Sequence, residues 1–158
     1  MQLILGQVLD LTDDPFTLDA PAQAARHLRR GAIAVSGGRI VETGPADDLR
    51  AAHPGAEPVE MGDALLLPGF VDAHVHYPQT AIIASWGKRL IDWLNAYTFP
   101  EEMRFGDPAY AAEIAARYLD LTTANGTTTV ASYGTIHPES VDALFAAAQI
   151  RVAPLVMH

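Results

Sequence analysis

The sequence predicts an α/β protein in which a small β-rich region precedes strands that alternate with helices. Two observations support this prediction. Short apolar runs, broken by glycines and prolines, fill the first part of the chain, as is typical of short strands and tight turns. From residue 70 onward, apolar or β-branched runs alternate with segments of helical spacing, which favours a parallel sheet with crossover helices. We therefore expect two domains, residues 1–67 and 68–158.

The first domain is expected to contain several short strands. Apolar residues on both sides of Gly6 indicate an irregular first strand, and residues 15–31 are expected to form a loop with a short helix. Residues 32–35 and 39–43 predict a β-hairpin, because the glycines between them supply the positive φ that a tight turn needs. Two further elements complete this domain: a short helix near residues 45–49 and an interrupted strand over residues 59–67.

The second domain begins with a strand over residues 70–76, whose apolar start predicts a buried position. Residues 79–97 carry apolar side chains at nearly helical spacing, and a clearer helix runs from Asp107 to Asn125. The remaining elements are a strand at 127–132, a helix from Pro138 and a final strand at 150–157. The two clearer helices are expected to bury Ala111, Ile114, Ala115, Tyr118 and Leu119, and Val141, Leu144, Phe145 and Ala148, respectively.

Composition narrows the possible classes of function. A chain of 158 residues with 49% apolar and 18% charged residues is typical of a globular protein with a core. Ten Lys and Arg against 19 Asp and Glu give a net charge of −9, which argues against a nucleic-acid partner. The lack of cysteine excludes disulfides, thiolate-ligated metals and a thiol nucleophile. No membrane-spanning run or signal peptide is recognisable, so we expect no membrane partner and a cytoplasmic location.

The strand at residues 70–76 carries a candidate metal site. Residues two apart in a strand point to the same side, so His74 and His76 are expected to project together, with Asp72. Neutral imidazole is a common ligand of zinc, and Asp72 could fix the tautomer of one ligand or cap a neighbouring element. Such a pair could instead lie on a solvated face, but the apolar residues 65–71 predict an interior strand. Burying two unpartnered imidazoles would cost about 1–3 kcal/mol each, so the context favours metal binding.

The segment Leu67–His76, with the sequence LPGFVDAHVH, resembles the first barrel strand of the amidohydrolase superfamily. Three further segments, His76–Gln79, Trp93–Glu102 and Asn125–Thr129, are similar to those of the guanine deaminases within it. The resemblance covers essentially the whole chain but only the first third or so of the family's length. It implies the first three strand–helix units of a metal-dependent (β/α)8 barrel, preceded by an incomplete β-rich sandwich domain.

The resemblance also implies an activity and roles for particular residues. The enzyme would convert guanine and water to xanthine and ammonia in purine catabolism, with one Zn2+ per subunit. His74 and His76 would be two ligands of that ion, and Gln79 would hydrogen-bond the purine. The stretch that lines the substrate pocket would comprise His76, Tyr77, Pro78 and Gln79. The full-length enzyme would be a homodimer.

No catalytic residue is assigned within this chain. In the family, the acid–base Glu, a ligand Asp and further ligand histidines come from later strands, so they are expected beyond residue 158. Two imidazoles leave zinc short of the three protein ligands typical of a catalytic site. We therefore expect the isolated chain to be inactive. His158, where related enzymes carry Asp, and Pro154 depart from the family's pattern and receive no role.

Two alternatives stay open. The first is another amidohydrolase that acts on a different heterocycle or on a cyclic amide, because many hydrolases share the strand motif. Gln79 and the segment Tyr97–Pro100 favour guanine over these substrates. The second is a non-catalytic βα module with structural histidines, which predicts a crystal without metal and unchanged stability when His74 is replaced by alanine.

Overall fold

The structure is a computed structural model that describes residues 1–150 of the chain. The chain divides into two compact units, Met1–Pro68 and Gly69–His158. Each unit combines strands with helices, so the predicted α/β class is confirmed. Within the described range, no helix is both long enough and apolar enough to cross a membrane.

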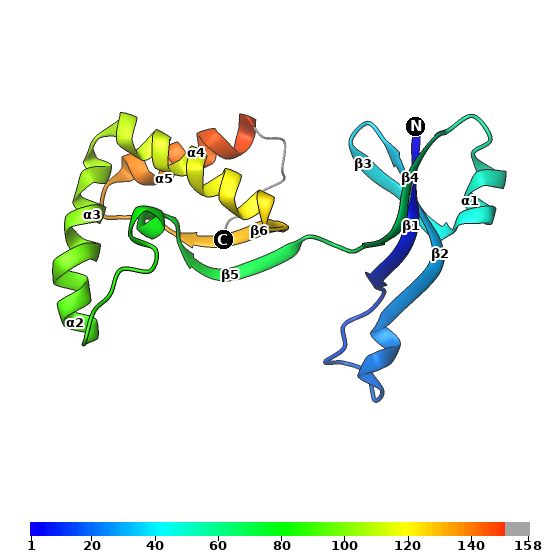
Figure 1. The fold of residues 1–158 in the computed structure, drawn as a ribbon, viewed down its shortest axis with the longest axis horizontal. Helices are drawn as coiled ribbons and strands as arrows, with labels where there is room; N and C mark the ends of the chain where they lie inside the picture. Colours follow the sequence, from blue (N-terminus) through cyan, green and yellow to red (C-terminus); the bar gives the residue numbers. More distant parts are fainter. Residues whose placement is uncertain (151–158) are drawn as a thin grey trace. The chain divides into compact units, whose positions relative to one another are not determined.

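The first unit is built on a four-stranded mixed sheet with the strand order β3-β2-β1-β4 (Figure 1). The strands are β1 (Gln2–Leu11), β2 (Ala25–Ser36), β3 (Arg39–Pro45) and β4 (Glu57–Leu66). A 3-10 helix, η1 (Pro21–Ala24), precedes β2, and helix α1 (Ala46–Ala52) connects β3 to β4. Antiparallel pairing joins β1 to β2 and β2 to β3, whereas β1 and β4 are parallel.

The core of the first unit lies between the sheet and α1. Its buried residues are Leu3, Leu5, Ala32, Ala34, Ala46 and Leu49. The strand residues in this set are two apart, as expected for one face of a pleated sheet. The predicted hairpin is confirmed, with Gly37 and Gly38 at φ values of 58° and 74° between β2 and β3. The predicted irregularity of the first strand is also confirmed, because the register of β1 with β2 shifts between Gly6 and Val8.

The expected loop over residues 15–31 is wrong for its second half, which forms the start of β2. This half continues the pairing with β1 as far as Leu11 opposite Ala25. Few of its side chains are apolar, but Arg26 contacts Asp10 across the strands, at 2.5 Å from Nη2 to Oδ2 and 3.0 Å from Nε to Oδ1. The bidentate hydrogen bonds from Arg26 hold the pKa of the Asp10 carboxyl below its usual value. Cross-strand polar contacts therefore accompany this pairing where an apolar pattern is lacking.

The second unit contains two parallel strands, β5 (Phe70–His76) and β6 (Thr127–Tyr133). The chain between them contains the long helix α4 (Pro108–Ala124), and α5 (Pro138–Ile150) follows β6. Shorter elements follow β5 in order: η2 (Tyr77–Ile82), α2 (Leu90–Trp93), the π-helical turn η3 (Leu94–Thr98), α3 (Phe99–Met103) and η4 (Arg104–Gly106). Figure 1 shows α4 and α5 over the same face of the strand pair. The predicted parallel pairing with a crossover helix is confirmed.

Helix α4 has the limits and the buried face that the sequence predicts. The Asp107 side chain accepts a hydrogen bond from the Ala109 amide at 2.9 Å, which caps the first turn. Asn125 forms the C-cap, and Gly126 follows with a φ of 82° that favours glycine. All five predicted core positions of this helix are buried: Ala111, Ile114, Ala115, Tyr118 and Leu119.

The predicted buried face of α5 is only partly right. Leu144 and Ala148 are buried, but Val141 and Phe145 are 43% and 42% exposed, and Ser140 is buried instead. The hydroxyl of Ser140 accepts a hydrogen bond from the Thr135 amide and donates one to the His137 carbonyl. Because local hydrogen bonds satisfy this hydroxyl, the helix can turn a polar residue inward. A final strand is expected over residues 150–157. Its first residue, Ile150, is the last residue of α5, and the others lie outside the described range.

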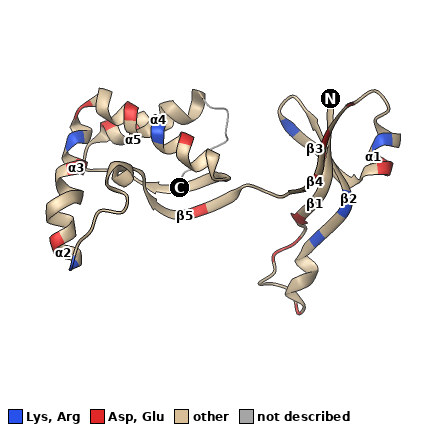
Figure 2. Ribbon diagram, viewed as in Figure 1, with Lys and Arg blue, Asp and Glu red and all other residues tan. Residues whose placement is uncertain are grey.

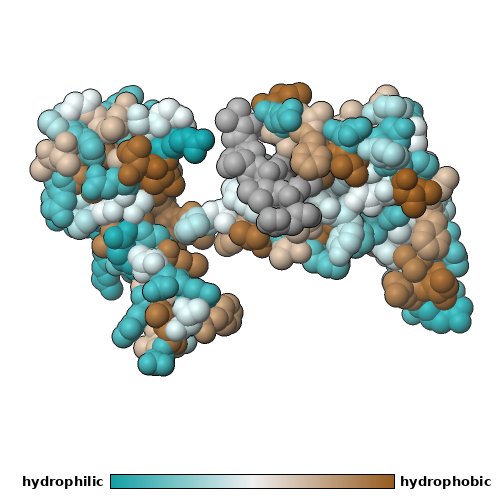
Figure 3. Space-filling view, turned by 180° about the vertical axis from the view of Figure 1, so that it is seen from behind, coloured by the Kyte–Doolittle hydropathy of each residue, from teal (hydrophilic) through white to brown (hydrophobic). Residues whose placement is uncertain are grey.

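The helical spacing of residues 79–97 corresponds to helical structure at both ends of this stretch but not to one continuous helix. The chain forms η2, leaves the helical path over the next residues and becomes helical again at α2. Ala84 has a φ of 64°, a left-handed conformation that cannot continue a right-handed helix. Figure 3 shows hydrophobic surface at the α2 end of the second unit. The large exposed apolar side chains in this stretch are Ile83, Trp86, Leu90 and Ile91.

The expected burial of β5 is also wrong for the described residues. Phe70 and Val71, which made the strand look interior, are 58% and 68% exposed. Within the described range β5 pairs only with β6, and α4 and α5 cover a single face of this pair (Figure 1). Apolar side chains therefore remain accessible on the uncovered face and along the edge of β5 that has no partner within the described residues.

Candidate functional site

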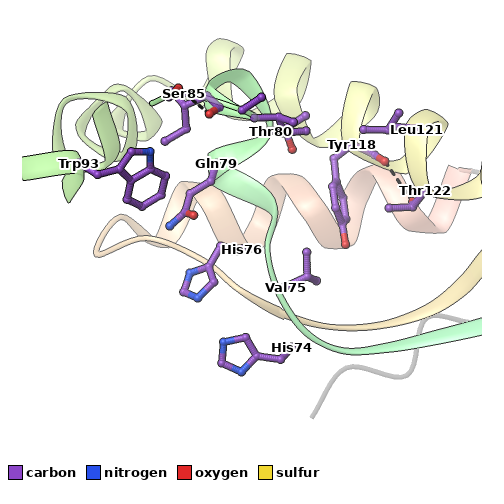
Figure 4. A pocket seen from close by; sticks show the side chains of 13 residues that line it. His74, Val75, His76, Gln79, Thr80, Ser85, Trp93, Tyr118, Leu121 and Thr122 are labelled. Atoms are coloured by element: carbon purple, nitrogen blue, oxygen red, sulfur yellow. Dashed lines mark hydrogen bonds between the residues drawn. The ribbon is translucent and has the colours of Figure 1, made fainter. Parts of the chain in front are cut away.

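A pocket of about 560 Å³ lies where β5 ends and η2 begins (Figure 4). Strand β5 contributes His74, Val75 and His76, and η2 contributes Gln79. The other walls include Trp93 of α2 and three residues of α4, namely Tyr118, Leu121 and Thr122. No Lys, Arg, Asp or Glu is among the described residues that line it. Figure 2 shows one acidic position on β5, and the sequence of this strand identifies it as Asp72.

The structure places His74 and His76 together. Their ring centroids are 5.5 Å apart, and Figure 4 shows both rings on the same side of β5 as Gln79. Tyr133 of β6 contacts both imidazoles, at 5.0 Å from His74 and stacked at 4.7 Å on His76 between ring centroids. In the part of the chain that is described, no side chain hydrogen-bonds the ring nitrogens of either histidine. The two rings are therefore held beside each other with their nitrogens available to a ligand.

Asp72 bonds to the backbone of β5. Its Oδ1 accepts a hydrogen bond from the His74 amide at 3.2 Å, and no contact with an imidazole nitrogen is present among residues 1–150. The register of β5 with β6 shifts between Asp72 and Val75, as in a β-bulge. Neither of the two roles considered for Asp72 is seen here, because its carboxylate bonds within its own strand, beside the irregular stretch that carries His74.

Gln79 lines the pocket at the start of η2 and is partly buried. Its Nε2 donates a hydrogen bond to Oε1 of Glu102 in α3, at 3.2 Å. The amide is thus held by a carboxylate, and Trp93 lines the same pocket (Figure 4). Gln79 can offer hydrogen bonds to a ligand in the space that the two histidines border.

Tyr77 and Pro78 occupy the core instead of the pocket. Both side chains are fully buried, and neither lines the pocket. The Tyr77 hydroxyl donates to the Ser140 carbonyl, and its ring packs edge-on against Phe105 at 5.5 Å between centroids. Burial raises the pKa of Tyr77 to about 12. These two side chains anchor the turn between His76 and Gln79, so within the predicted stretch only its two ends reach the pocket.

Replacing Tyr77 by phenylalanine is expected to lower the free energy of unfolding by about 1 kcal/mol, because the Ser140 carbonyl loses its buried donor. Denaturant unfolding followed by circular dichroism measures this change. Tyr97→Phe is the matched control, since Tyr97 is 39% exposed. Equal stability of the two variants would contradict a structural role for the Tyr77 hydroxyl.

Several pocket residues were missed by sequence reasoning. Tyr118 looked like a core residue of α4, and it is buried, but it also lines the pocket. Its hydroxyl has no hydrogen-bond partner among the described residues, and burial, helped by the charge of Asp72, raises its pKa to about 12. Tyr133 is the register partner of His76, so only the pairing of β5 with β6 reveals its contact with the histidines. Trp93 belonged to a recognisable segment, but its position against Gln79 depends on tertiary structure.

Residues 1–150 contain no group of three or more His, Cys, Asp or Glu side chains that could hold a metal ion. His74 and His76, whose ring centroids are 5.5 Å apart, could supply two ligands of a shared ion. A catalytic zinc site normally has three protein ligands.

The sequence of this chain is similar to those of two protein families and of known enzymes. The sequence profile of the amidohydrolase family matches residues 65–158, and that of the imidazolonepropionase-like composite domain of bacteria matches residues 31–56. The guanine deaminase of Escherichia coli K12 is 38% identical over 152 residues, which are 94% of this chain and 34% of the relative.

Two solved structures share the fold. The crystal structure of guanine deaminase from Bradyrhizobium japonicum matches with a TM-score of 0.91 and 35% identity, over 99% of this chain and 34% of that one. An adenosine deaminase from Xanthomonas campestris, solved with bound zinc, matches with a TM-score of 0.73 and 26% identity, over 94% and 31%. The chain thus spans about a third of the length of these relatives.

Proposed function

Because this chain belongs to the amidohydrolase family, we propose that it forms the amino-terminal part of a zinc-dependent guanine deaminase. Such an enzyme converts guanine and water into xanthine and ammonia. The observation that carries the proposal is the position of His74, His76 and Gln79 on one side of the chain, around one pocket at the end of β5. Similarity to the guanine deaminases of two bacteria supports guanine as the substrate.

We propose that β5 and β6 are the first two strands of a (β/α)8 barrel, with α4 as the helix of the first crossover. Enzymes of this fold place their sites at the carboxyl ends of the strands. His76 is the last residue of β5, which agrees with such a site. Residues 68–158 would then supply three strand–helix units, and residues 1–67 a separate β-rich domain that further strands complete.

The histidines fit part of a metal site. Their rings lie beside each other, and their nitrogens have no partner within the described residues. Stacking of Tyr133 on His76 limits the rotation of that ring, which favours a fixed ligand geometry. A bound zinc ion would activate water for attack on the substrate. The remaining ligands and the acid–base residues would come from strands outside this chain.

The pocket suits a flat, neutral, nitrogenous base. Its volume of about 560 Å³ lies in the range of small-molecule sites, and its walls combine aromatic and apolar side chains with a few polar groups. The amide of Gln79 offers both an acceptor and donors, which matches the edge of a purine. Trp93 beside it supplies an apolar surface against which a planar ring can lie.

The chain alone is expected to bind zinc weakly and to show no deaminase activity, because two imidazoles cannot complete a catalytic site. Isothermal titration of the 158-residue chain with zinc tests the first part. His74→Ala should remove the weak binding, whereas His27→Ala, which changes an exposed residue of the first unit, should leave it unchanged. A tight site with one ion per chain would contradict this expectation.

The proposed substrate is tested on the complete polypeptide that contains these residues. Guanine, adenine and cytosine are assayed side by side, and the release of ammonia is measured. We expect guanine to have by far the largest kcat/KM. A clear preference for another heterocycle or a cyclic amide would instead support a different amidohydrolase.

A further inference from the structure

We infer that Glu102 is a positioning residue that fixes which end of the Gln79 amide faces the pocket. The inference rests on the proposed function for the identity of the ligand. It concerns the contact between Gln79 of η2 and Glu102 of α3. Glu102 itself does not line the pocket.

The direction of the hydrogen bond determines the orientation of the amide. Nε2 of Gln79 lies 3.2 Å from Oε1 of Glu102. A carboxylate accepts hydrogen bonds and cannot donate them, so the amide nitrogen must face it. Turning the amide by half a rotation would bring two oxygen atoms together. One of the two Nε2 hydrogens is thus engaged by Glu102, and the carbonyl oxygen of Gln79 is turned away from the carboxylate, where it can accept a hydrogen bond from a ligand.

Glu102 can exert this control because its helix is held in place. The neighbouring Glu101 is only 6% exposed and accepts hydrogen bonds from the Tyr110 hydroxyl and, at 3.1 Å, from Nη1 of Arg104. The Arg104 guanidinium also lies over the Tyr110 ring, at 3.7 Å from its centroid. These contacts tie α3 to α4, so the carboxylate of Glu102 approaches Gln79 from a fixed backbone.

An oriented carbonyl selects a ligand edge that donates. Guanine carries donors at its ring N1–H and its 2-amino group, whereas unsubstituted purine has an acceptor at N1 and only a C–H at position 2. A site built to hydrogen-bond a donor discriminates against an analogue that lacks it, because the acceptor is then left unpaired. Glu102 would thus favour guanine over purine without touching either.

Glu102→Gln in the complete polypeptide tests this inference, because a glutamine at that position can either donate or accept and no longer imposes one orientation. We expect the KM for guanine to rise about five- to tenfold, with kcat changed less than about twofold. The inhibition constant of unsubstituted purine should change less than about twofold. Glu57→Gln, an exposed position in the first unit, is the control and should alter none of these values.

A charge exchange provides a second test that does not depend on how well one variant folds. Gln79→Glu alone places two carboxylates side by side and should raise the KM for guanine strongly. Adding Glu102→Gln restores the hydrogen bond in the reverse direction and again leaves an oxygen facing the pocket. The double variant should therefore have a KM about fivefold or more below that of Gln79→Glu.

The outcomes separate the two proposals. Equal increases in the guanine KM and the purine inhibition constant, unchanged values in Glu102→Gln, or a double variant no better than Gln79→Glu would overturn the role of Glu102. In each of these cases the unaltered enzyme still deaminates guanine. An unaltered enzyme with no activity on guanine would overturn the proposed function and, with it, the inference.

Discussion

Replacing either His74 or His76 by alanine is expected to reduce kcat/KM for guanine at least about 1,000-fold in the complete polypeptide. The two rings lie 5.5 Å apart at the pocket with free nitrogens, so each would supply one bond to the same ion. Removing one ligand leaves an incomplete site, and the water that the ion activates is lost with it. Steady-state kinetics with guanine, together with zinc content by elemental analysis, measure both consequences.

The controls are two histidines remote from this pocket. His27 contacts Gln7 at 3.2 Å and His53 contacts Glu42 at 3.1 Å, all within the first unit. Their alanine variants should keep full zinc content and activity. If His74→Ala also kept its zinc and its activity, the histidines of β5 would be structural, and the non-catalytic alternative would gain support.

Replacing Gln79 by alanine is expected to lower kcat/KM for guanine about 10- to 100-fold, mainly through a higher KM. The amide lines the pocket, and its loss removes the hydrogen bonds proposed for the purine edge. Zinc content should stay unchanged, because Gln79 is not proposed as a ligand. This combination of altered KM and intact metal separates substrate binding from metal binding.

A matched control is Gln23→Ala, which removes an exposed amide in η1 of the first unit. It should leave kcat, KM and zinc content unchanged. An unaltered KM in Gln79→Ala would contradict the role proposed for this amide. A loss of zinc in the same variant would show that Gln79 supports the metal site instead.

Elements whose limits depend on local chemistry could be predicted from the sequence. The glycine pair at 37–38 set the hairpin, because both residues adopt the positive φ that its turn requires. Asp107 and Asn125 mark the ends of α4 through a side-chain cap and a following glycine. These signals act within a few residues, so no knowledge of the rest of the fold is needed to use them.

Elements that depend on distant partners could not be predicted in the same way. Residues 25–31 look like a polar loop, yet they form a strand because β1 offers a partner and Asp10 an ion pair for Arg26. The apolar spacing of residues 79–97 is nearly helical, but the left-handed Ala84 divides this stretch. In both cases the tertiary structure overrides the local pattern.

In the candidate site, too, the local sequence predicted some features, and others depended on the folded chain. The two-residue period of a strand was enough to predict that His74 and His76 lie together. It was not enough to show that Tyr77 points into the core while Gln79 points into the pocket, since the chain leaves the strand at that position. The contact between Gln79 and Glu102 joins residues 23 positions apart and became visible only in the folded chain.

The most direct test of the metal site is anomalous diffraction at the zinc edge from crystals of the complete polypeptide. We expect one strong peak at about 2.0–2.1 Å from a ring nitrogen of His74 and at the same distance from one of His76. An anomalous peak at another position, with the two imidazoles turned away from each other and no anomalous density between them, would contradict the proposal.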